Sequence, residues 1–250
     1  MHRLLVPAAE LGRERPSLPP DALRHLKVVR PRDGEEVELF DGAGAKRVYR
    51  YDAAARGLAQ SGEIVRLPRP KPLTLFACVT KGSRWDWTVE KATELGVTRI
   101  VPVVSERTIV RIPASERAAK RERWTRIAED AARQSDAVWI PEVVEPVDFR
   151  DSLALVGRTR CFVGALVEPP ARPILEAVAA CAAGIGPDGL SVYVGPEGDF
   201  TPAELAALME IATPVNFGPT ILRAETAAIF AVSVLSSWMA SDNARKGGVE

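Results

Sequence analysis

The chain has 250 residues, of which 46% are hydrophobic and 26% charged, a balance typical of a folded globular protein. This length suits one large domain or two modest ones. The longest apolar run, 227–240, is interrupted by serines, so we expect no transmembrane span, and the first residues lack the apolar core of a signal peptide. Three cysteines without a C-x-x-C pair argue against a disulfide framework or a zinc site and indicate a reducing, cytoplasmic location.

The formal net charge of zero conceals an uneven distribution. Residues 1–72 and 73–135 each carry an excess of four positive charges, and residues 136–250 an excess of eight negative charges. Arginines outnumber lysines 26 to 7, and a guanidinium group can hold phosphate or carboxylate through two parallel hydrogen bonds. The pattern favours a polyanion-facing first half beside a region for a small molecule or a dimer contact. A GC-rich genome would give the same arginine content without any such function.

The first seventy residues predict a small β-rich domain. Polar and apolar residues alternate over 35–40, Asp41-Gly42 indicates a hairpin turn, and a second strand is expected over 47–51. A short helix is expected from Asp21 to about residue 29. Short strands of this kind suit a compact barrel over residues 1–70. Three prolines within 66–72 then indicate a linker.

From residue 73 onwards the pattern changes to alternating strands and helices. Such alternation predicts a mainly parallel sheet with helices on both faces, in a second domain over 73–250. Strands are expected at 73–79, 98–104, 159–166, 191–195 and 214–217, and helices at 83–95, 115–134, 171–183 (ended by Gly184), 201–211 and 225–240.

Two loops of the second domain are candidates for a ligand site. In the first, Gly195-Pro196-Glu197-Gly198 precedes a helix with a Thr201/Glu204 capping box. Its glycines would let backbone amides approach a ligand. The same residues also suit a simple turn before a well-capped helix, with no ligand. In the second, 216–227, Arg223 is the only basic residue between Arg172 and Arg245. It is either paired with Glu225 or part of a site. Both loops follow expected strands, where open α/β sheets bind ligands.

Several common enzyme signatures are absent. The sequence contains no phosphate-binding G-x-x-x-x-G-K-[ST], no dinucleotide G-x-G-x-x-G and no G-x-S-x-G nucleophile turn. The only histidines are His2 and His25, so a histidine-dependent triad or histidine metal site in the second domain is excluded. Cys161 and Cys181 are expected to be small core residues.

At these loops the chain resembles the bacterial small-subunit rRNA uracil-N3 methyltransferases (RsmE-like) of the SPOUT superfamily. The resemblance covers nearly the whole chain, and it rests on the order and spacing of motifs that are individually weak. Asp199 departs from it, because this family usually has a glycine there. The motifs are HLKVVR at 25–30, LFDG at 39–42, KATELGV at 91–97, SER at 105–107, RW at 123–124 with AARQS at 131–135, GPEG at 195–198 and ILRAETA at 221–227.

The resemblance implies an N-terminal PUA-like β-barrel that helps to hold RNA. It also implies a SPOUT methyltransferase domain with a C-terminal trefoil knot, a homodimer, and S-adenosylmethionine as the methyl donor, with no metal. The implied donor site consists of three loops: Leu166, Val167 and Glu168; Gly195, Pro196, Glu197 and Gly198; and Phe217, Gly218, Ile221, Leu222 and Arg223.

Methylation of N3 of a uridine requires loss of the imide proton, so the reaction needs a proton acceptor or a group that stabilises the developing anion. Arg223 is the candidate for stabilising charge on a uracil carbonyl. Glu197 and Glu225 are the candidates for accepting the proton, although either could instead be a structural hydrogen-bond partner.

The implied partner is 16S rRNA in the small ribosomal subunit, with no DNA and no membrane. Two other functions remain open: a SPOUT methyltransferase for tRNA or another rRNA nucleotide, and an RNA-binding assembly factor with a vestigial donor pocket. The candidate RNA-binding residues are Arg3, Arg24, Lys27 and Arg30 in the first domain, and Lys81, Arg84, Arg107 and Arg111, expected near the domain junction.

Overall fold

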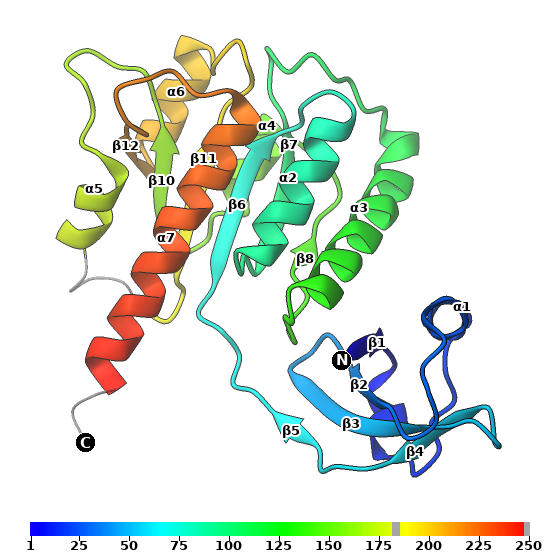
Figure 1. Ribbon diagram of the computed structural model, residues 1–250. Coiled ribbons are helices and arrows are strands. Elements are labelled where there is room, and N and C mark those ends of the chain that lie inside the picture. The colour runs from blue at the N-terminus through cyan, green and yellow to red at the C-terminus, as the bar shows by residue number, and fades with distance from the viewer. Residues whose placement is uncertain (182–185, 248–250) are drawn as a thin grey trace. The chain divides into compact units, whose positions relative to one another are not determined.

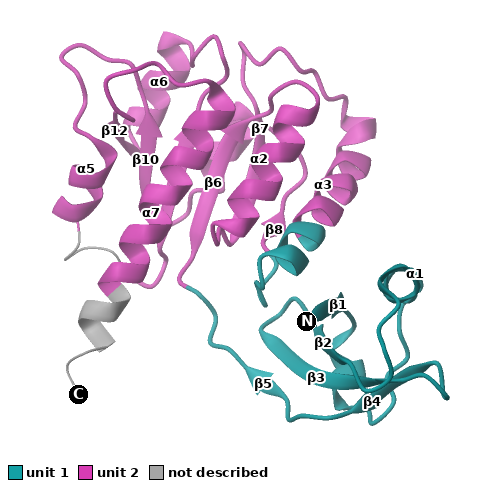
Figure 2. Cartoon of the chain, viewed as in Figure 1, with its two compact units in different colours: residues 1–70, 129–140 teal, residues 71–128, 141–250 magenta. Residues whose placement is uncertain are grey.

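The computed structural model describes residues 1–181 and 186–247 (Figure 1). The chain divides into two compact units, each with its own sheet (Figure 2). The first contains Met1–Pro70 and Glu129–Ile140, and the second contains Lys71–Ala128 and Pro141–Glu250.

The first unit contains a five-stranded sheet in the order β1-β2-β3-β4, with β5 also paired to β3. Strand β1 runs parallel to β2 and the other pairs are antiparallel. Among the described residues these pairings do not close into a ring. The elements are β1 (His2–Leu5), η1 (Ala8–Gly12), α1 (Pro20–Val29), β2 (Glu36–Phe40), β3 (Ala45–Asp52), β4 (Gly57–Gln60) and β5 (Val65–Arg66).

The expected hairpin after β2 is confirmed. The Asp41 carboxylate accepts hydrogen bonds from the backbone N–H groups of Ala43 and Ala45, at 2.8 and 2.9 Å. Gly42 and Gly44 have positive φ angles of 72° and 99°, which glycine adopts without a steric penalty.

Residues 129–140 belong to the first unit, although the sequence suggested that they form part of the second domain. The backbone N–H of Ile140 donates to the carbonyl of Gly42 at 3.0 Å, and that of Gly44 donates to Val138 at 3.2 Å. The Trp139 indole N–H donates to the carbonyl of Pro68 at 3.1 Å. Long helix α3 (Ala114–Gln134) therefore starts in one unit and ends in the other.

Arg3 is part of a buried network in the first unit. Its Nε donates to Glu38 Oε1 at 2.7 Å, and Lys46 Nζ lies 2.9 Å from the other oxygen of Glu38. The Arg3 side chain is 3% exposed, and its remaining donors reach the carbonyls of Ala132, Arg133 and Ala137. The prediction that Arg3 binds RNA is therefore wrong, because its guanidinium group is already occupied by protein acceptors.

The second unit confirms the predicted α/β architecture, with a seven-stranded sheet in which every pair is parallel. Its order is β12-β10-β11-β6-β7-β8, with β9 also paired to β7. The strands are β6 (Leu73–Cys78), β7 (Arg99–Val104), β8 (Glu142–Val143), β9 (Val147–Asp148), β10 (Arg160–Gly164), β11 (Leu190–Val194) and β12 (Ala212–Val215).

Helices cover both faces of this sheet. Helices α2 (Ser83–Glu94) and α7 (Ala224–Gly247) lie side by side in front of β6, whereas α4 (Phe149–Ala154) and α6 (Pro202–Met209) lie behind the sheet (Figure 1). The core on the side of α4 and α6 includes Phe76 and Tyr193, whose rings stack at 4.4 Å.

Some elements differ from the expected ones. Helix α4 and the two-residue strands β8 and β9 were not anticipated, because segments this short have no measurable periodicity. Helix α5 spans Ile174–Ala180, and the part of the expected helix at 182–183, with its stop at Gly184, lies outside the described residues.

Helix α7 is longer than its run of apolar letters suggested. By length and composition alone, its segment Ala224–Asp242 could cross a membrane. The same test is passed by a core helix of a soluble protein, and 39% of this window is buried inside the structure. The sequence analysis expected a helix at 225–240 but no membrane-spanning segment, because serines interrupt its apolar run.

Candidate functional site

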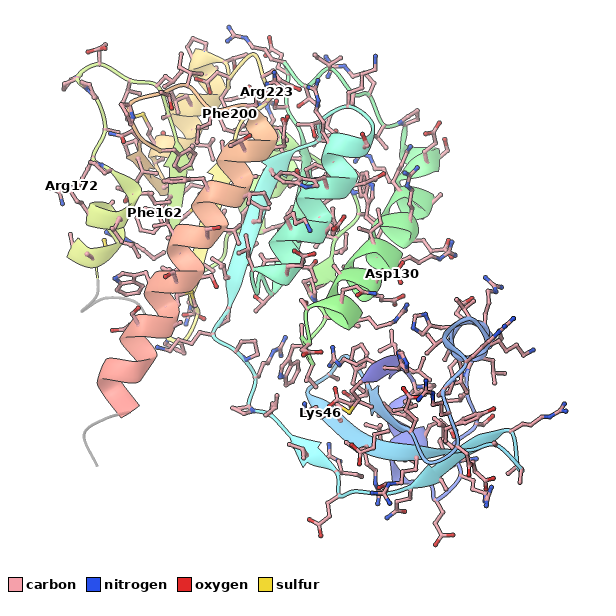
Figure 3. All side chains as sticks on the ribbon, in the orientation of Figure 1. Lys46, Asp130, Phe162, Arg172, Phe200 and Arg223 are labelled. Carbon is pink, nitrogen blue, oxygen red and sulfur yellow. The ribbon has the colours of Figure 1, made fainter. Side chains whose placement is uncertain are left out.

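The loops that follow β10, β11 and β12 meet around a cavity of about 310 Å³. These three parallel strands lie next to one another in the sheet, in the order β12-β10-β11, so their carboxyl ends reach the same edge. Arg223 lies at this edge, beside the start of α7 (Figure 3). The cavity is lined by Gly164, Ala165, Leu166, Val194, Gly195, Pro196, Glu197, Asp199, Val215, Asn216, Phe217, Gly218, Thr220, Ile221, Leu222, Arg223, Ala224 and Ala227.

Most of the predicted donor-site residues lie on this lining: Leu166, Gly195, Pro196, Glu197, Phe217, Gly218, Ile221, Leu222 and Arg223. Val167, Glu168 and Gly198 do not line the cavity, and neither does Glu225. The sequence analysis missed Asn216, Thr220 and Asp199 as lining residues, although all three lie within the two loops that it singled out. A polar residue beside a Gly-Pro turn was the available signal for Asn216 and Thr220.

Close packing of Gly164 and Phe217 forms one wall of the cavity. A Cβ atom at position 164 would overlap the Phe217 ring, so only glycine lets this ring lie against the end of β10. The Phe217 ring also lies 6.0 Å from that of Phe230 on α7.

A turn after β11 forms a second wall. The N–H of Asp199 donates to the carbonyl of Pro196 at 2.9 Å, and the Asp199 carboxylate accepts from the N–H of Phe200 at 2.7 Å. Asp199 has a φ of 59°, a left-handed conformation that Asp tolerates better than most residues. The departure from the usual glycine is therefore compatible with the turn, and it adds a carboxylate to the cavity lining.

The predicted capping box of α6 is confirmed, and it also holds the loop after β7. Thr201 accepts from the N–H of Glu204, whose carboxylate accepts from the N–H of Thr201. The other oxygen of Glu204 accepts from the N–H of Glu106 at 2.9 Å. Arg107 donates to the carbonyl of Gly198 at 2.9 Å, so the segment 105–107 supports the turn that lines the cavity.

The loop after β12 is held by Asn216. Its side-chain amide donates to the carbonyl of Ala171, and its Oδ1 accepts from the N–H of Gly218 at 3.2 Å. The chain then reaches Arg223, whose carbonyl accepts from the N–H of Ala227 in the first turn of α7 at 2.8 Å. The backbone of Arg223 thus begins the helix, while its side chain is exposed at the cavity.

Of the two sequence-based alternatives for Arg223, the structure contradicts its pairing with Glu225 and places it on the cavity lining. Glu225 pairs with Arg84 rather than with Arg223: Glu225 Oε1 lies 3.8 Å from Arg84 Nε. Arg84 Nη1 also lies 3.6 Å from Glu197 Oε1. Among the described residues, no ion pair within 4.0 Å involves Arg223. The second oxygen of Glu225 is buried, and no described residue forms a hydrogen bond with it.

Two of the three cysteines, Cys78 and Cys161, are buried and poorly suited to act as nucleophiles. Burial raises the pKa of the Cys78 thiol to about 12 and that of Cys161 to about 11, so both are protonated at neutral pH. Among the described residues, no group of three or more His, Cys, Asp and Glu side chains could hold a metal ion.

The predicted RNA-binding residues fall into two groups. Arg24 and Lys27 are exposed on α1 and spaced three apart, so they are neighbours on the helix surface, and the exposed Arg30 follows the end of the helix in a left-handed conformation. The others follow the carboxyl ends of β6 and β7, at the edge that carries the cavity, whereas the linker joins β6 at its amino end. Lys81, Arg84, Arg107 and Arg111 thus follow strand ends at this edge of the sheet, and Arg107 and Arg111 both donate to loop carbonyls.

Residues 67–236 match the model of a family described as an RNA methyltransferase domain. A ribosomal RNA small subunit methyltransferase E from Synechocystis is 30% identical, over 96% of this chain and 78% of that protein. The Bacillus subtilis protein of the same name is 35% identical over 67% of each chain. The chain belongs to the ribosomal RNA small subunit methyltransferase E family.

Solved structures of this family and its relatives have the same fold. The Neisseria gonorrhoeae ribosomal RNA small subunit methyltransferase E, bound to S-adenosyl methionine, superposes with a TM-score of 0.79 at 29% identity, over 95% of this chain and 98% of that one. A methyltransferase from Legionella pneumophila in complex with the same cofactor gives 0.77 at 26% identity, over 94% and 97%.

Proposed function

We propose that this protein methylates N3 of a uridine in the 16S rRNA of the small ribosomal subunit, with S-adenosylmethionine as the donor. The observation that carries the proposal is the cavity formed by three strand-end loops, with an exposed arginine that no carboxylate of the described residues pairs with, in a chain of this family. Two relatives named for small-subunit rRNA methylation and two structural relatives that hold the donor support it.

The cavity suits the donor in size and chemistry. Its volume of about 310 Å³ lies within the range of small-molecule sites. Leu166, Ile221 and Leu222 supply apolar surface for an adenine ring, and the glycine-containing turns expose backbone groups that could hydrogen-bond to it. Carboxylates of Glu197 and Asp199 line the cavity and suit a positively charged sulfonium. When bound, the donor supplies an electrophilic methyl group.

The residues of this chain would then hold the nucleophile and manage its charge. Glu197 is the candidate to accept the imide proton from uracil N3, because its side chain lines the cavity whereas that of Glu225 does not. Arg223 would stabilise the negative charge that spreads to a uracil carbonyl as this proton leaves. Alignment of the nucleophilic nitrogen with the methyl group would contribute much of the rate enhancement.

The first unit would bind RNA and the second would carry out catalysis. The first unit, Met1–Pro70 with Glu129–Ile140, would be a PUA-like RNA-binding domain, with Arg24 and Lys27 on α1 and Arg30 at its carboxyl end facing the phosphate backbone. The second unit, Lys71–Ala128 with Pro141–Glu250, would form the SPOUT catalytic domain, with a trefoil knot at the loops around the cavity. Lys81, Arg107 and Arg111 would bind RNA beside that cavity. A protein with this substrate would work in the cytoplasm.

A homodimer would form through the second unit. Helix α7 buries one side in the core, including Val232, Leu235 and Met239. On another side, Phe230, Val234 and Trp238 line a groove between α5 and α7, in which Leu175 is 56% and Phe230 39% exposed. Light scattering at micromolar concentration is expected to give twice the mass of one chain for the wild-type protein. The Phe230→Glu variant is expected to have the mass of a single chain. A wild-type monomer would contradict this part of the proposal.

Two measurements test the proposed function. Calorimetry is expected to detect S-adenosylmethionine binding to the free protein, and no binding would indicate a vestigial pocket. The protein is expected to transfer labelled methyl groups to unmodified small subunits and not to tRNA. Transfer to tRNA alone would favour the other SPOUT activity.

A further inference from the structure

The geometry points to Arg84 as a positioning residue of the catalytic centre, which holds Glu197 and Glu225 and so keeps Arg223 free for the substrate. This inference rests on the proposed function and extends it to a residue that the sequence suggested only as a phosphate contact.

Arg84 is placed to serve both carboxylates at once. It lies in the first turn of α2, and its guanidinium group has separate nitrogens 3.6 Å from Glu197 and 3.8 Å from Glu225. Those two glutamates come from different loops, 197 after β11 and 225 in the first turn of α7. A planar guanidinium can bridge two carboxylates in a way that a single ammonium group cannot.

Without this bridge, the site would carry unbalanced negative charge. The Glu225 side chain is 10% exposed, and its second oxygen has no hydrogen-bond partner within the part of the chain that the structure describes. A buried carboxylate with so few partners favours the nearest available cation. If Arg84 were removed, the basic residue nearest to Glu225 in the sequence would be Arg223. It is two residues from Glu225 and lies on the same cavity lining as Glu197. Its guanidinium group would then be drawn away from the uracil.

A positioning role and a phosphate contact predict different effects. A residue that contacts phosphate contributes to RNA affinity and to its salt dependence, about one unit of log–log slope per contact. A residue that positions Glu197 and Arg223 affects the rate of the bound complex instead, because misplacement of reacting groups by about 1 Å can cost on the order of 100-fold. The side chain of Arg84 is half exposed, so exposure alone does not separate the two roles.

The test compares Arg84→Gln, Arg84→Lys and Lys81→Ala in single-turnover methylation with saturating donor and RNA, together with RNA dissociation constants at several salt concentrations and donor binding by calorimetry. We expect Arg84→Gln to lower the single-turnover rate about 10- to 100-fold, with RNA affinity, its salt slope and donor affinity unchanged. Arg84→Lys should recover part of the rate, since it keeps the charge but loses the fork. Lys81→Ala, three residues away, should show the opposite pattern: weaker RNA binding and a smaller salt slope.

A double variant tests whether Arg84 acts through Glu225. If it does, Arg84→Gln/Glu225→Gln is expected to lose no more rate than the slower of the two single variants, since the pair acts as one unit. The inference is overturned if Arg84→Gln weakens RNA binding while the rate of the bound complex stays at the wild-type value, or if the two single losses multiply. Absence of methylation by the wild-type protein would instead overturn the proposed function, so the two failures are distinguishable.

Discussion

Glu225 lies within 3.8 Å of Arg84, on another helix, rather than pairing with Arg223 two residues before it in the chain. This pairing leaves the guanidinium group of Arg223 exposed at the cavity without an ion-pair partner among the described residues. An arginine in that state can meet an incoming anion without first breaking an internal contact.

Replacement of Arg223 by alanine is therefore expected to lower the methylation rate far more than the donor affinity. Loss of one group that stabilises charge in the transition state typically costs on the order of 100- to 1000-fold in rate, or about 3–4 kcal/mol. The folded state should be little affected, because the helix contact at this position is made by the backbone carbonyl. Single-turnover assays with thermal melts check both effects. Near-normal turnover by a well-folded Arg223→Ala protein would remove this residue from the mechanism.

Replacement of Gly164 by alanine is expected to weaken donor binding. The new Cβ atom would overlap the Phe217 ring, which must then move into or away from the cavity that it lines. We expect the dissociation constant of the donor to rise at least about tenfold, which corresponds to a loss of about 1.4 kcal/mol of binding free energy. Gly12→Ala is the control, because nothing lies within 4 Å of a Cβ atom there. Unchanged donor affinity in a folded Gly164→Ala protein would contradict the assigned wall of the site.

The affinity for RNA is expected to fall steeply with salt, and the donor affinity much less. Each phosphate contact contributes about 0.9 to the slope of log affinity against log salt on duplex nucleic acid, whereas the donor would be held mainly by uncharged groups. A combined Arg24→Ala and Lys27→Ala variant should lower the RNA slope by about two and leave calorimetric donor binding unaltered. Equal salt dependence for the two ligands would contradict the separation of the two binding regions.

Glu38→Gln is expected to destabilise the first unit by about 3–5 kcal/mol, because it breaks a buried ion pair and leaves the Arg3 charge to the Asp136 carboxylate, which lies 3.5 Å away and is 86% exposed. Glu36→Gln on the same strand is the control, since its pair with Arg50 is exposed and such pairs are worth about 0–1 kcal/mol. Denaturant melts of both variants at neutral pH check the difference, and equal melts would contradict the role of this network.

The same network predicts a pH dependence. Burial alone would raise the pKa of Glu38, but hydrogen bonds from Lys46 and Arg3 outweigh it and hold the pKa below its ordinary value of 4.5. A lowered folded-state pKa means that the contribution to stability is complete above the ordinary value and is lost as the pH falls through the lower folded value. The stability difference between wild type and Glu38→Gln should therefore shrink only below about pH 4.5.

Local sequence signals predicted much of the second unit correctly. Alternating apolar runs located its main strands and helices, and Thr201 with Glu204 gave the correct helix start. The loops around Glu197 and Arg223 were identified because glycine, proline and a lone cation interrupt those patterns after a strand.

These local signals could not predict contacts between residues that are distant in sequence. Nothing local to Arg3 indicates that carbonyls of 132–137 will occupy it, and nothing near Glu225 indicates that Arg84 will be its partner. Both outcomes depend on tertiary packing, which also assigns 129–140 to the first unit.

The most direct test of the account is to map the methyl group itself. Unmodified small subunits are incubated with the protein and S-adenosylmethionine, and the 16S rRNA is then copied by reverse transcriptase, which an N3-methyluridine stops because it blocks base pairing. We predict a strong stop at a single uridine, absent without donor and strongly reduced with the Arg223→Ala protein. Transfer of methyl groups without any stop, or stops that persist unchanged with Arg223→Ala, would contradict the account.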